Sequence, residues 1–239
     1  SLFSNWSSFA TAASFLPSPG GAYGGGYFAG QINDGGTIYN LVVAPVTSGA
    51  LEGQYGGATP ATIQWKTSAT GPDTTAQSEV YGATAMLANN TSTWPMFDWC
   101  KNAAGGPNAG NYDATNVAGT GIGGYNDWYI PAKNELAVLY FFLKPDTTAN
   151  NTGSGSNPNS VAPYTPSTNY GPGFPNQTTS TLFQAGGAQA FSTAPFYWSA
   201  TEYSSFTNGA WFQNFTSGVQ TIQPKLFGQY ARAVRRIAA

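Results

Sequence analysis

The chain contains no histidine and a single cysteine, Cys100, among its 239 residues. Without an imidazole or a second thiol, the chain can form neither a histidine-activated nucleophile nor a metal site built from histidines and cysteines. One cysteine also excludes an intramolecular disulfide framework, and with it the secreted modules that such bridges hold together. We therefore expect Cys100 to be a small buried apolar residue.

Charge is scarce as well. Only 8% of the residues are charged, eight residues are Lys or Arg, and the net charge is −2. Three of these cations, Arg232, Arg235 and Arg236, lie together near the C-terminus, so the chain lacks the basic surface that nucleic acid requires. Long hydrophobic runs are missing too, and we expect neither a retained signal peptide nor a membrane span.

Aromatic residues and glycine, by contrast, are abundant. Aromatic side chains make up 15% of the chain, with seven Trp and fourteen Tyr, and there are thirty Gly. This composition predicts many short strands and tight turns that carry large packing groups, as is common in extracellular binding proteins. A chain of this length can bury a sizeable core, and we expect one domain over residues 24–239.

Residues 1–23 stand apart from that domain. Phe3, Trp6, Phe9 and Phe15 make this segment too apolar for a free tail, but it ends in Pro and Gly and has no clear place in a following sheet. Two interpretations stay open. The segment either caps the core of its own domain or is an anchor that docks on another subunit.

The clearest local signals lie in residues 123–144, which read GGYNDWYIPAKNELAVLYFFLK. Aromatic and β-branched residues at 127–130 predict a short strand. Pro131 suits the first position of a helix, Leu136 and Leu139 belong to an apolar stripe with 3 and 4 spacing, and Pro145 prevents continuation. The pattern predicts a helix over 131–144 whose apolar face needs a sheet to cover it.

The remaining elements follow from alternation, turn residues and weaker helical spacing. A hairpin is expected from strands at 26–32 and 37–44 around the turn residues 33–36, followed by a strand at 62–66. Weaker helices are expected within 74–89, from 95 to 100 and around 182–191. The last quarter predicts a β-meander that closes the sheet, with strands at 196–201, 209–216, 219–223 and 229–237.

Two loop motifs suggest a bound group, and neither has the required context. Gly119, Gly121 and Gly124 form a G-x-G-x-x-G pattern, but a strand-like segment follows it instead of the helix that a dinucleotide site needs. Residues 111–116 offer oxygen ligands for Ca²⁺, but their spacing matches no EF-hand loop. We expect no cofactor, and a metal ion is only a weak alternative.

Residues 146–195 form a long stretch dominated by Asn, Ser, Thr, Gly and Pro, which we call the excursion. A loop of that length inside a compact domain is usually functional or disordered. Its aromatic residues argue against full disorder, because such side chains need something to pack on or to bind. We expect the excursion to present a binding surface through Tyr164, Tyr170, Phe174 and Phe183.

Four motifs carry a resemblance to a known family. They are GGYNDWYIPAKNELAVLY at 123–140, YWSATE at 197–202, AWFQNFTSG at 210–218 and YARAVRR at 230–236. In order and spacing they resemble the DUF1566 family, also called the Lcl C-terminal domain family, and a less specific match reaches back to about Tyr27. The resemblance implies an α+β domain with a C-type lectin-like fold, in which a central antiparallel sheet and two main helices carry a long irregular excursion that displays a binding surface.

The same resemblance implies relatives with different activities. Similar folds occur in formylglycine-generating enzymes and in the variable proteins of diversity-generating retroelements, and family members occur on bacterial surfaces and in tailed-phage virions. The enzymes depend on active-site cysteines, and this chain has only Cys100, in a different region. Calcium-dependent lectins use a Glu-Pro-Asn or similar triplet, which follows none of Glu52, Glu135 and Glu202. We therefore expect neither an enzyme nor a calcium-dependent sugar site.

Structural roles are expected for the motif residues. The acids nearest to the motifs, Asp127, Glu135 and Glu202, could form a glycosidase pair, but a turn for Asp127, a helix start for Glu135 and an ion pair for Glu202 fit better. We expect Glu202 to pair with Arg232 or Arg235. The large apolar members of the motifs are expected in the core: Trp128, Leu136, Leu139, Trp198, Trp211 and Tyr230.

Together with these observations, the resemblance implies a non-enzymatic protein on the virion surface of a tailed phage, associated with the tail or a fibre. It would bind a host-surface glycan or protein through the excursion, and other virion proteins through residues 1–23. Two alternatives stay open, namely a capsid decoration or head-fibre protein anchored by residues 1–23, and a bacterial surface adhesin. The oligomeric state is open, and a homo-oligomer is compatible with each of them.

Overall fold

The computed structural model describes residues 16–52, 62–73, 77–115, 119–193 and 196–239, so the expected anchor residues Phe3, Trp6, Phe9 and Phe15 lie outside the described residues. The described ranges form an α+β structure with antiparallel sheets and four α-helices. The helices are α1 (Val46–Gly49), α2 (Ala83–Ala88), α3 (Pro95–Asn102) and α4 (Lys133–Leu143), with a 3₁₀ turn η2 at Ile122–Gly124. The strands are β1 (Ala22–Tyr23), β2 (Gly26–Asp34), β3 (Thr37–Val43), β4 (Ala50–Leu51), β5 (Ile63–Gln64), β6 (Tyr197–Glu202), β7 (Gly209–Gln213), β8 (Gln220–Pro224), β9 (Gly228–Gln229), β10 (Ala231–Arg232) and β11 (Val234–Ala238).

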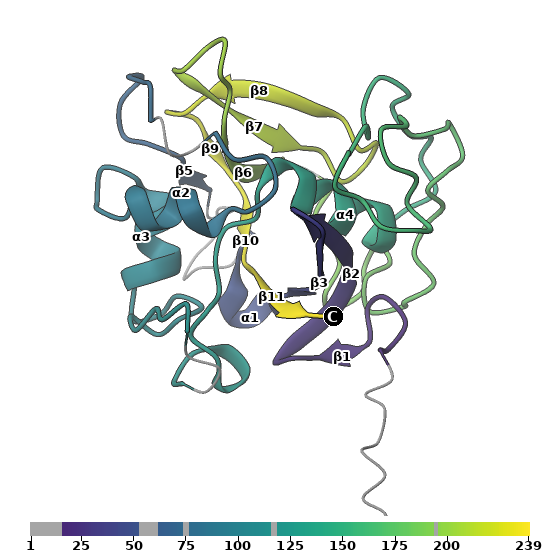
Figure 1. Ribbon diagram of the computed structural model, residues 1–239, viewed down its shortest axis with the longest axis horizontal. Helices are drawn as coiled ribbons and strands as arrows, with labels where there is room; N and C mark the ends of the chain where they lie inside the picture. The colour runs from purple at the N-terminus through teal and green to yellow at the C-terminus, as the bar shows by residue number, and fades with distance from the viewer. Residues whose placement is uncertain (1–15, 53–61, 74–76, 116–118, 194–195) are drawn as a thin grey trace, which may run out of the picture.

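The largest sheet has the strand order β1-β2-β3-β11. β2 and β3 form the predicted hairpin, with Asp34 opposite Thr37 next to the turn. β11 pairs antiparallel with β3 over its whole length, beginning with Val234 opposite Val43. The C-terminal strand therefore lies beside the N-terminal hairpin (Figure 1).

The predicted C-terminal meander is wrong in its pairing. β6, β7 and β8 form a three-stranded sheet of their own, but β9 pairs with β5, β10 with β4 and β11 with β3. Alternation along a strand indicates which residues share a face, and it does not indicate which strand lies alongside. β11 also carries Arg235 and Arg236, which form ion pairs with acids outside the last quarter of the chain. These ion pairs accompany the pairing of β11 with β3.

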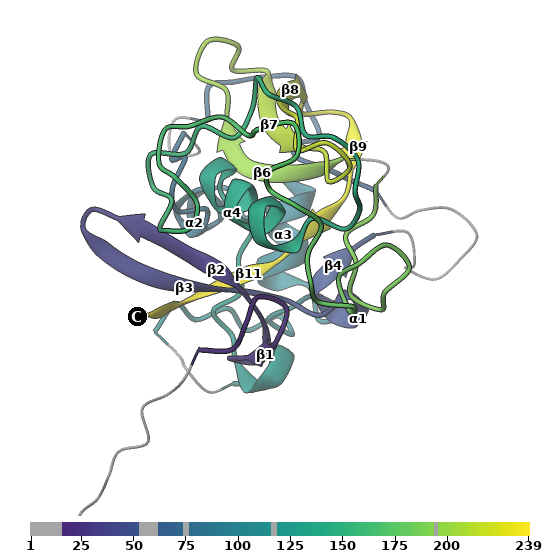
Figure 2. The ribbon, with the colours of Figure 1, turned by 90° about the vertical axis from the view of Figure 1, so that its right-hand side faces the viewer.

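Helix α4 lies between the two larger sheets (Figure 2). It begins at Lys133, and the side chain of Glu135 accepts a hydrogen bond from the backbone N–H of the N-cap residue Ala132 at 2.7 Å. Its close approach to β2 depends on Gly30, which has φ of +111°. A Cβ atom at that position would lie 2.3 Å from Cδ2 of Phe142, so only glycine fits.

Three other local predictions need correction. Residues 127–130 form a single bridge from Tyr129 to Val234 instead of a strand. The helix expected within 74–89 is reduced to α2. The helix expected around 182–191 is a series of turns, in which Gly186 has φ of +85° and interrupts the helical spacing.

Part of the segment expected to stand apart belongs to the sheet. Ala22 and Tyr23 form β1, which pairs with β2. The backbone N–H of Gly20 also donates to the carbonyl oxygen of Phe28 at 2.7 Å. The expectation that residues 1–23 have no place in the sheet is therefore wrong for residues 20–23.

Most of the expected core residues are buried. Trp128, Leu136, Leu139 and Trp198 are almost completely excluded from solvent, and Tyr230 is 5% exposed. Trp211 is only partly buried, which corrects its predicted place in the core. The centre of its ring on β7 lies 4.3 Å from the Lys133 ammonium, and the ring packs edge-on against Tyr203.

Candidate functional site

The excursion has no helix or strand in its described part, residues 146–193, yet buried hydrogen bonds hold it to the body. The side-chain oxygen of Asn150 accepts hydrogen bonds from the Tyr140 hydroxyl at 2.6 Å and from the Lys144 ammonium at 2.8 Å. Its amide nitrogen donates to the carbonyl oxygens of Gly171 and Pro175, each at 3.0 Å. One buried asparagine thus joins the end of α4 to two turns of the excursion.

A second set of amides holds the middle of the excursion. The Asn157 side chain donates to the backbone oxygen of Asn134 in α4 at 2.9 Å. The Asn159 side chain donates to the backbone oxygen of Asn33 at the end of β2, also at 2.9 Å. The excursion is thereby tied to both the hairpin and the helix, and on Figure 1 it occupies the side of the molecule opposite α2 and α3.

The aromatic residues expected to bind a ligand are mostly buried. Tyr164 is 2% exposed, Tyr170 is 3% exposed and Phe183 is fully buried, so the expectation that they present a surface is wrong. Tyr164 stacks on Phe141 of α4 with ring centroids 4.2 Å apart, and Phe183 packs edge-on against Tyr27 of β2 at 5.4 Å. These rings hold the excursion against the body, because an irregular loop must bury apolar surface to be ordered.

Phe174 is the exception among the four, since it is 51% exposed. Its ring packs edge-on against Phe141 at 5.1 Å. The neighbouring hollow, lined by Phe174, Tyr164 and Asn169, has a volume of only about 50 Å³. Together with the exposed residues 165–169 and 172–173 it forms a shallow polar surface with one aromatic centre, which can bind a ligand by surface contact.

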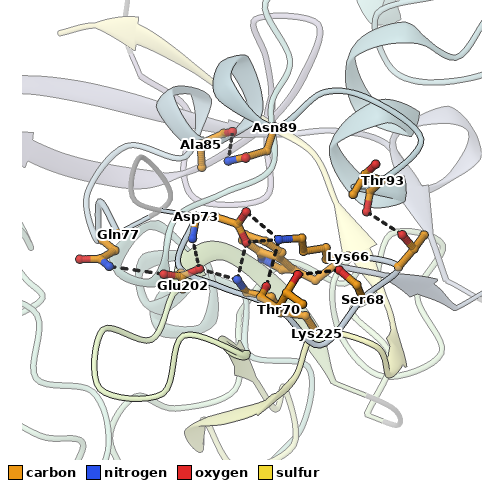
Figure 3. Close-up of polar contacts among 12 residues, drawn as sticks. Lys66, Ser68, Thr70, Asp73, Gln77, Ala85, Asn89, Thr93, Glu202 and Lys225 are labelled. Carbon is orange, nitrogen blue, oxygen red and sulfur yellow. Dashed lines mark hydrogen bonds and ion pairs between the residues drawn. The ribbon is translucent and has the colours of Figure 1, made fainter.

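A cluster of four charged side chains lies buried at one end of the β6–β7–β8 sheet, where β6 and β8 end (Figure 3). The Lys225 ammonium lies 2.6 Å from Asp73 and forms a short ion pair with Glu202, and Lys66 lies 2.9 Å from the other Asp73 oxygen. Burial raises the pKa of Asp73, but hydrogen bonds from Lys225 and Lys66 outweigh it, and the net shift lowers that pKa. The predicted pairing of Glu202 with Arg232 or Arg235 is wrong, because Lys225 at the end of β8 is nearer.

The three C-terminal arginines pair with acids elsewhere. Because β10 lies beside β4 and β11 beside β3, each guanidinium meets a carboxylate that is distant in sequence. Burial raises the pKa of Glu52, although the guanidinium beside it opposes that shift. The pairs are Arg232 with Glu52 at 3.2 Å, Arg235 with Asp127 at 2.6 Å, and Arg236 with Glu135 at 2.8 Å and Asp34 at 2.9 Å.

The contacts of the charged groups and of Cys100 limit the chemistry that these side chains can perform. Asp127, Glu135 and Glu202, the acids considered for glycoside hydrolysis, each accept a hydrogen bond from a buried cation. Burial raises the pKa of the Cys100 thiol well above its ordinary value, which suppresses the thiolate. Among the residues that the structure describes, no group of three His, Cys, Asp or Glu side chains could hold a metal ion.

One pocket was not predicted from the sequence. A cavity of about 230 Å³, which we call the tyrosine pocket, is lined by Asp34, Tyr39, Tyr81, Tyr112, Asp127 and Arg236. These residues come from five separate segments of the chain, so no spacing pattern connects them. The one related feature of the sequence is its content of fourteen tyrosines, which does not indicate which of them lie together.

Across the described ranges, no helix is both long and apolar enough to cross a lipid bilayer. No curated protein and no solved structure matches the chain. The family model of the Lcl C-terminal domain matches residues 59–235, about three quarters of the chain, and starts after the β2–β3 hairpin. The chain therefore belongs to the Lcl C-terminal domain family.

Proposed function

We propose that this protein is a non-enzymatic virion-surface protein of a tailed phage, associated with the tail or a fibre. It contacts a host-surface glycan or protein through the outer face of the excursion, centred on Phe174 and residues 165–169. The observation that carries the proposal is the anchoring of an irregular segment from beneath by buried amides and aromatic rings. A surface loop held in one conformation binds with little loss of entropy, which suits recognition.

The proposal includes a C-type lectin-like fold. Two antiparallel sheets with α4 between them, and a long excursion without regular structure, are compatible with that fold. The phage location is carried over from the family resemblance, because members with this helix motif and a short N-terminal segment are common among tailed-phage virion proteins. Five of the eight Lys and Arg side chains pair with carboxylates in the interior, and this arrangement favours binding over catalysis.

A structural role is the second candidate, as a capsid decoration or head-fibre protein. Two observations favour it. Residues 1–15 contain four large aromatic residues in a polar chain. In addition, Phe206, Leu226 and Phe227 are 43%, 38% and 53% exposed at one end of the β6–β7–β8 sheet, and exposed apolar surface often marks a contact between proteins. A bacterial surface adhesin with the same binding face is the third candidate.

Binding to host cells tests the proposal with two matched pairs of substitutions. Phe174→Ala with Thr165→Glu removes the aromatic centre and adds a charge on the outer face of the excursion. Phe227→Ala with Thr221→Glu makes equal changes at exposed positions on the β8 side. We expect the first variant to lose cell binding by at least about tenfold and the second to keep it. Equal binding by both variants contradicts a receptor role for the excursion.

Removal of residues 1–15 separates the first two candidates. It leaves the contacts of residues 20–23 with β2 in place. If the protein binds receptors, the shortened chain still binds cells but dissociates from the particle. If the full-length chain binds no cells and only the particle retains it, the structural role stands instead.

A further inference from the structure

We propose that the tyrosine pocket is a binding site for a neutral saccharide unit. It is separate from the outer face of the excursion, so the inference does not depend on the proposed host receptor. The pocket is built where the ends of β2, β3 and β11 meet the loops before α2 and before α4. At about 230 Å³ it lies below the usual range for drug-sized ligands, and it suits a single small ring.

Arg236 forms a fixed part of the pocket. Its Nε atom lies 2.8 Å from a carboxylate oxygen of the buried Glu135, and its Nη1 atom lies 2.9 Å from Asp34. Its guanidinium carbon lies 5.0 Å from the centre of the Tyr39 ring and 4.4 Å from that of Tyr81. Hydrogen bonds and two aromatic rings thus hold the arginine in one position before any ligand arrives.

Three tyrosine hydroxyls are left for a ligand. Those of Tyr39, Tyr81 and Tyr112 form no hydrogen bond with any residue that the structure describes, although all three residues are partly buried. Burial raises the pKa of Tyr81, with the Glu135 carboxylate adding to it, and burial and the neighbouring Tyr81 raise the pKa of Tyr112. The hydroxyls of Tyr81 and Tyr112 therefore stay protonated, and a phenol hydroxyl can both donate and accept a hydrogen bond.

The charges around the pocket select against ionic ligands. Three carboxylates, on Asp34, Asp127 and Glu135, face two guanidinium groups, on Arg235 and Arg236, so the net charge disfavours an anion. A cation would have to share the Tyr39 and Tyr81 rings with Arg236, which repels it.

A neutral ring with several hydroxyls carries no charge and can form hydrogen bonds with the free tyrosine hydroxyls. Its hydroxyls can bond to the phenols and to the Asp34 carboxylate, and its C–H groups can pack on a tyrosine face. Of the two Asp34 oxygens, only Oδ2 bonds to a described residue, Arg236, so the other can accept from a ligand hydroxyl. Neutral hexoses and N-acetylated hexosamines have this chemistry.

Titration of the full-length protein with single sugars tests the inference. Glucose, galactose, mannose and N-acetylglucosamine are the neutral probes, and N-acetylneuraminic acid and glucosamine are the charged ones. Saturation-transfer NMR and calorimetry measure binding. We expect at least one neutral sugar to bind in the millimolar range and the charged ones to bind at least about fivefold more weakly.

Removing single oxygen atoms locates the site. Tyr39→Phe with Tyr112→Phe keeps both rings and should weaken binding by about tenfold or more, since each hydroxyl contributes about one hydrogen bond. The control, Tyr27→Phe with Tyr203→Phe, removes two hydroxyls that also lack partners among the described residues and lie outside the pocket, and binding should not change.

Three results overturn the inference, namely no binding of any neutral sugar, preference for a charged sugar, or equal affinity in the two double variants. Thermal melts of both variants should match the parent protein, so that a loss of affinity reports the site and not the fold. The cell-binding result for Phe174→Ala with Thr165→Glu is measured separately, and its outcome leaves this inference unchanged.

Discussion

Asn33 and Asn159 are joined by two hydrogen bonds that connect the β2–β3 hairpin to the excursion. The backbone N–H of Asn33 donates to the Asn159 carbonyl oxygen at 2.7 Å, and the Asn159 side chain donates to the Asn33 carbonyl oxygen at 2.9 Å. The same side chain accepts a hydrogen bond from Asn134 of α4 at 2.8 Å. A single asparagine therefore fixes the position of an irregular segment against a strand and a helix, which is the role that a ladder of backbone bonds has in a sheet.

The first prediction concerns this asparagine. Asn159→Ala leaves the Asn33 carbonyl and the buried Asn134 amide without their partner, so we expect a loss of about 1 to 3 kcal/mol in the free energy of unfolding. Hydrogen exchange of residues 151–169 should become faster, since local opening of the excursion becomes easier. Urea denaturation and exchange mass spectrometry measure the two effects.

Asn176→Ala is the matched control for that change. Asn176 is exposed in the same excursion, and its side chain has no hydrogen bond within the described ranges. We expect a change within about 0.5 kcal/mol and unchanged exchange. Equal effects of the two substitutions would mean that the Asn33–Asn159 contact does not hold the excursion.

The second prediction concerns the buried charged cluster. Glu202→Gln removes one of the two carboxylates around the Lys225 ammonium, which is completely buried. We expect a loss of about 3 to 5 kcal/mol in unfolding free energy, because a buried charge is left partly uncompensated. Glu79→Gln is the control, since Glu79 pairs with Lys133 at 3.1 Å but its side chain is 44% exposed. It should change stability by less than about 1 kcal/mol.

The third prediction is that Asp73 and Glu52 make the free energy of unfolding depend on pH with opposite signs. The lowered pKa of Asp73 gives a stabilising contribution that is complete above about pH 3.8 and is lost as the pH falls through the folded-state value. The raised pKa of Glu52 gives a contribution that is complete below about pH 4.5 and is lost as the pH rises through the folded-state value.

Denaturation at several pH values checks this difference. Relative to the parent protein, Asp73→Asn should be most destabilised near neutral pH, and the difference should shrink as the pH falls below about 3.8. For Glu52→Gln the destabilisation should instead decrease as the pH rises above about 4.5. Parallel curves for the two variants would contradict the assigned shifts.

The parts of the fold that local sequence decides were predictable. The turn residues 33–36 and the alternation around them predicted the β2–β3 hairpin, and the 3 and 4 spacing around Leu136 and Leu139 predicted α4. The pairing of β11 with β3 was not predictable, because the residue pattern of a strand does not indicate which distant strand it pairs with.

The site residues show the same limit. The aromatic residues of the excursion indicated that their rings contact other apolar groups. Their pattern did not show whether those groups belong to a ligand or to the rest of this chain. The partner of Tyr164 is Phe141 on α4, which reaches it only once the excursion folds back. Likewise the partner of Glu202 is Lys225, a single lysine in a turn, while the clustered arginines were the more visible candidates.

The last prediction tests whether α4 is the packed centre of the domain. Leu139 is fully buried on the helix that lies between the two larger sheets. Leu139→Ala should lower the free energy of unfolding by about 2 to 5 kcal/mol, because the deleted atoms leave a cavity that the surrounding sheets can fill only in part. Leu87→Ala is the control, since Leu87 on α2 is 48% exposed and its truncation should change stability by no more than about 0.5 kcal/mol. Urea denaturation followed by tryptophan fluorescence compares them. An effect of Leu139→Ala as small as that of the control would show that α4 does not bury this side chain, and the arrangement of the sheets around α4 would then be wrong.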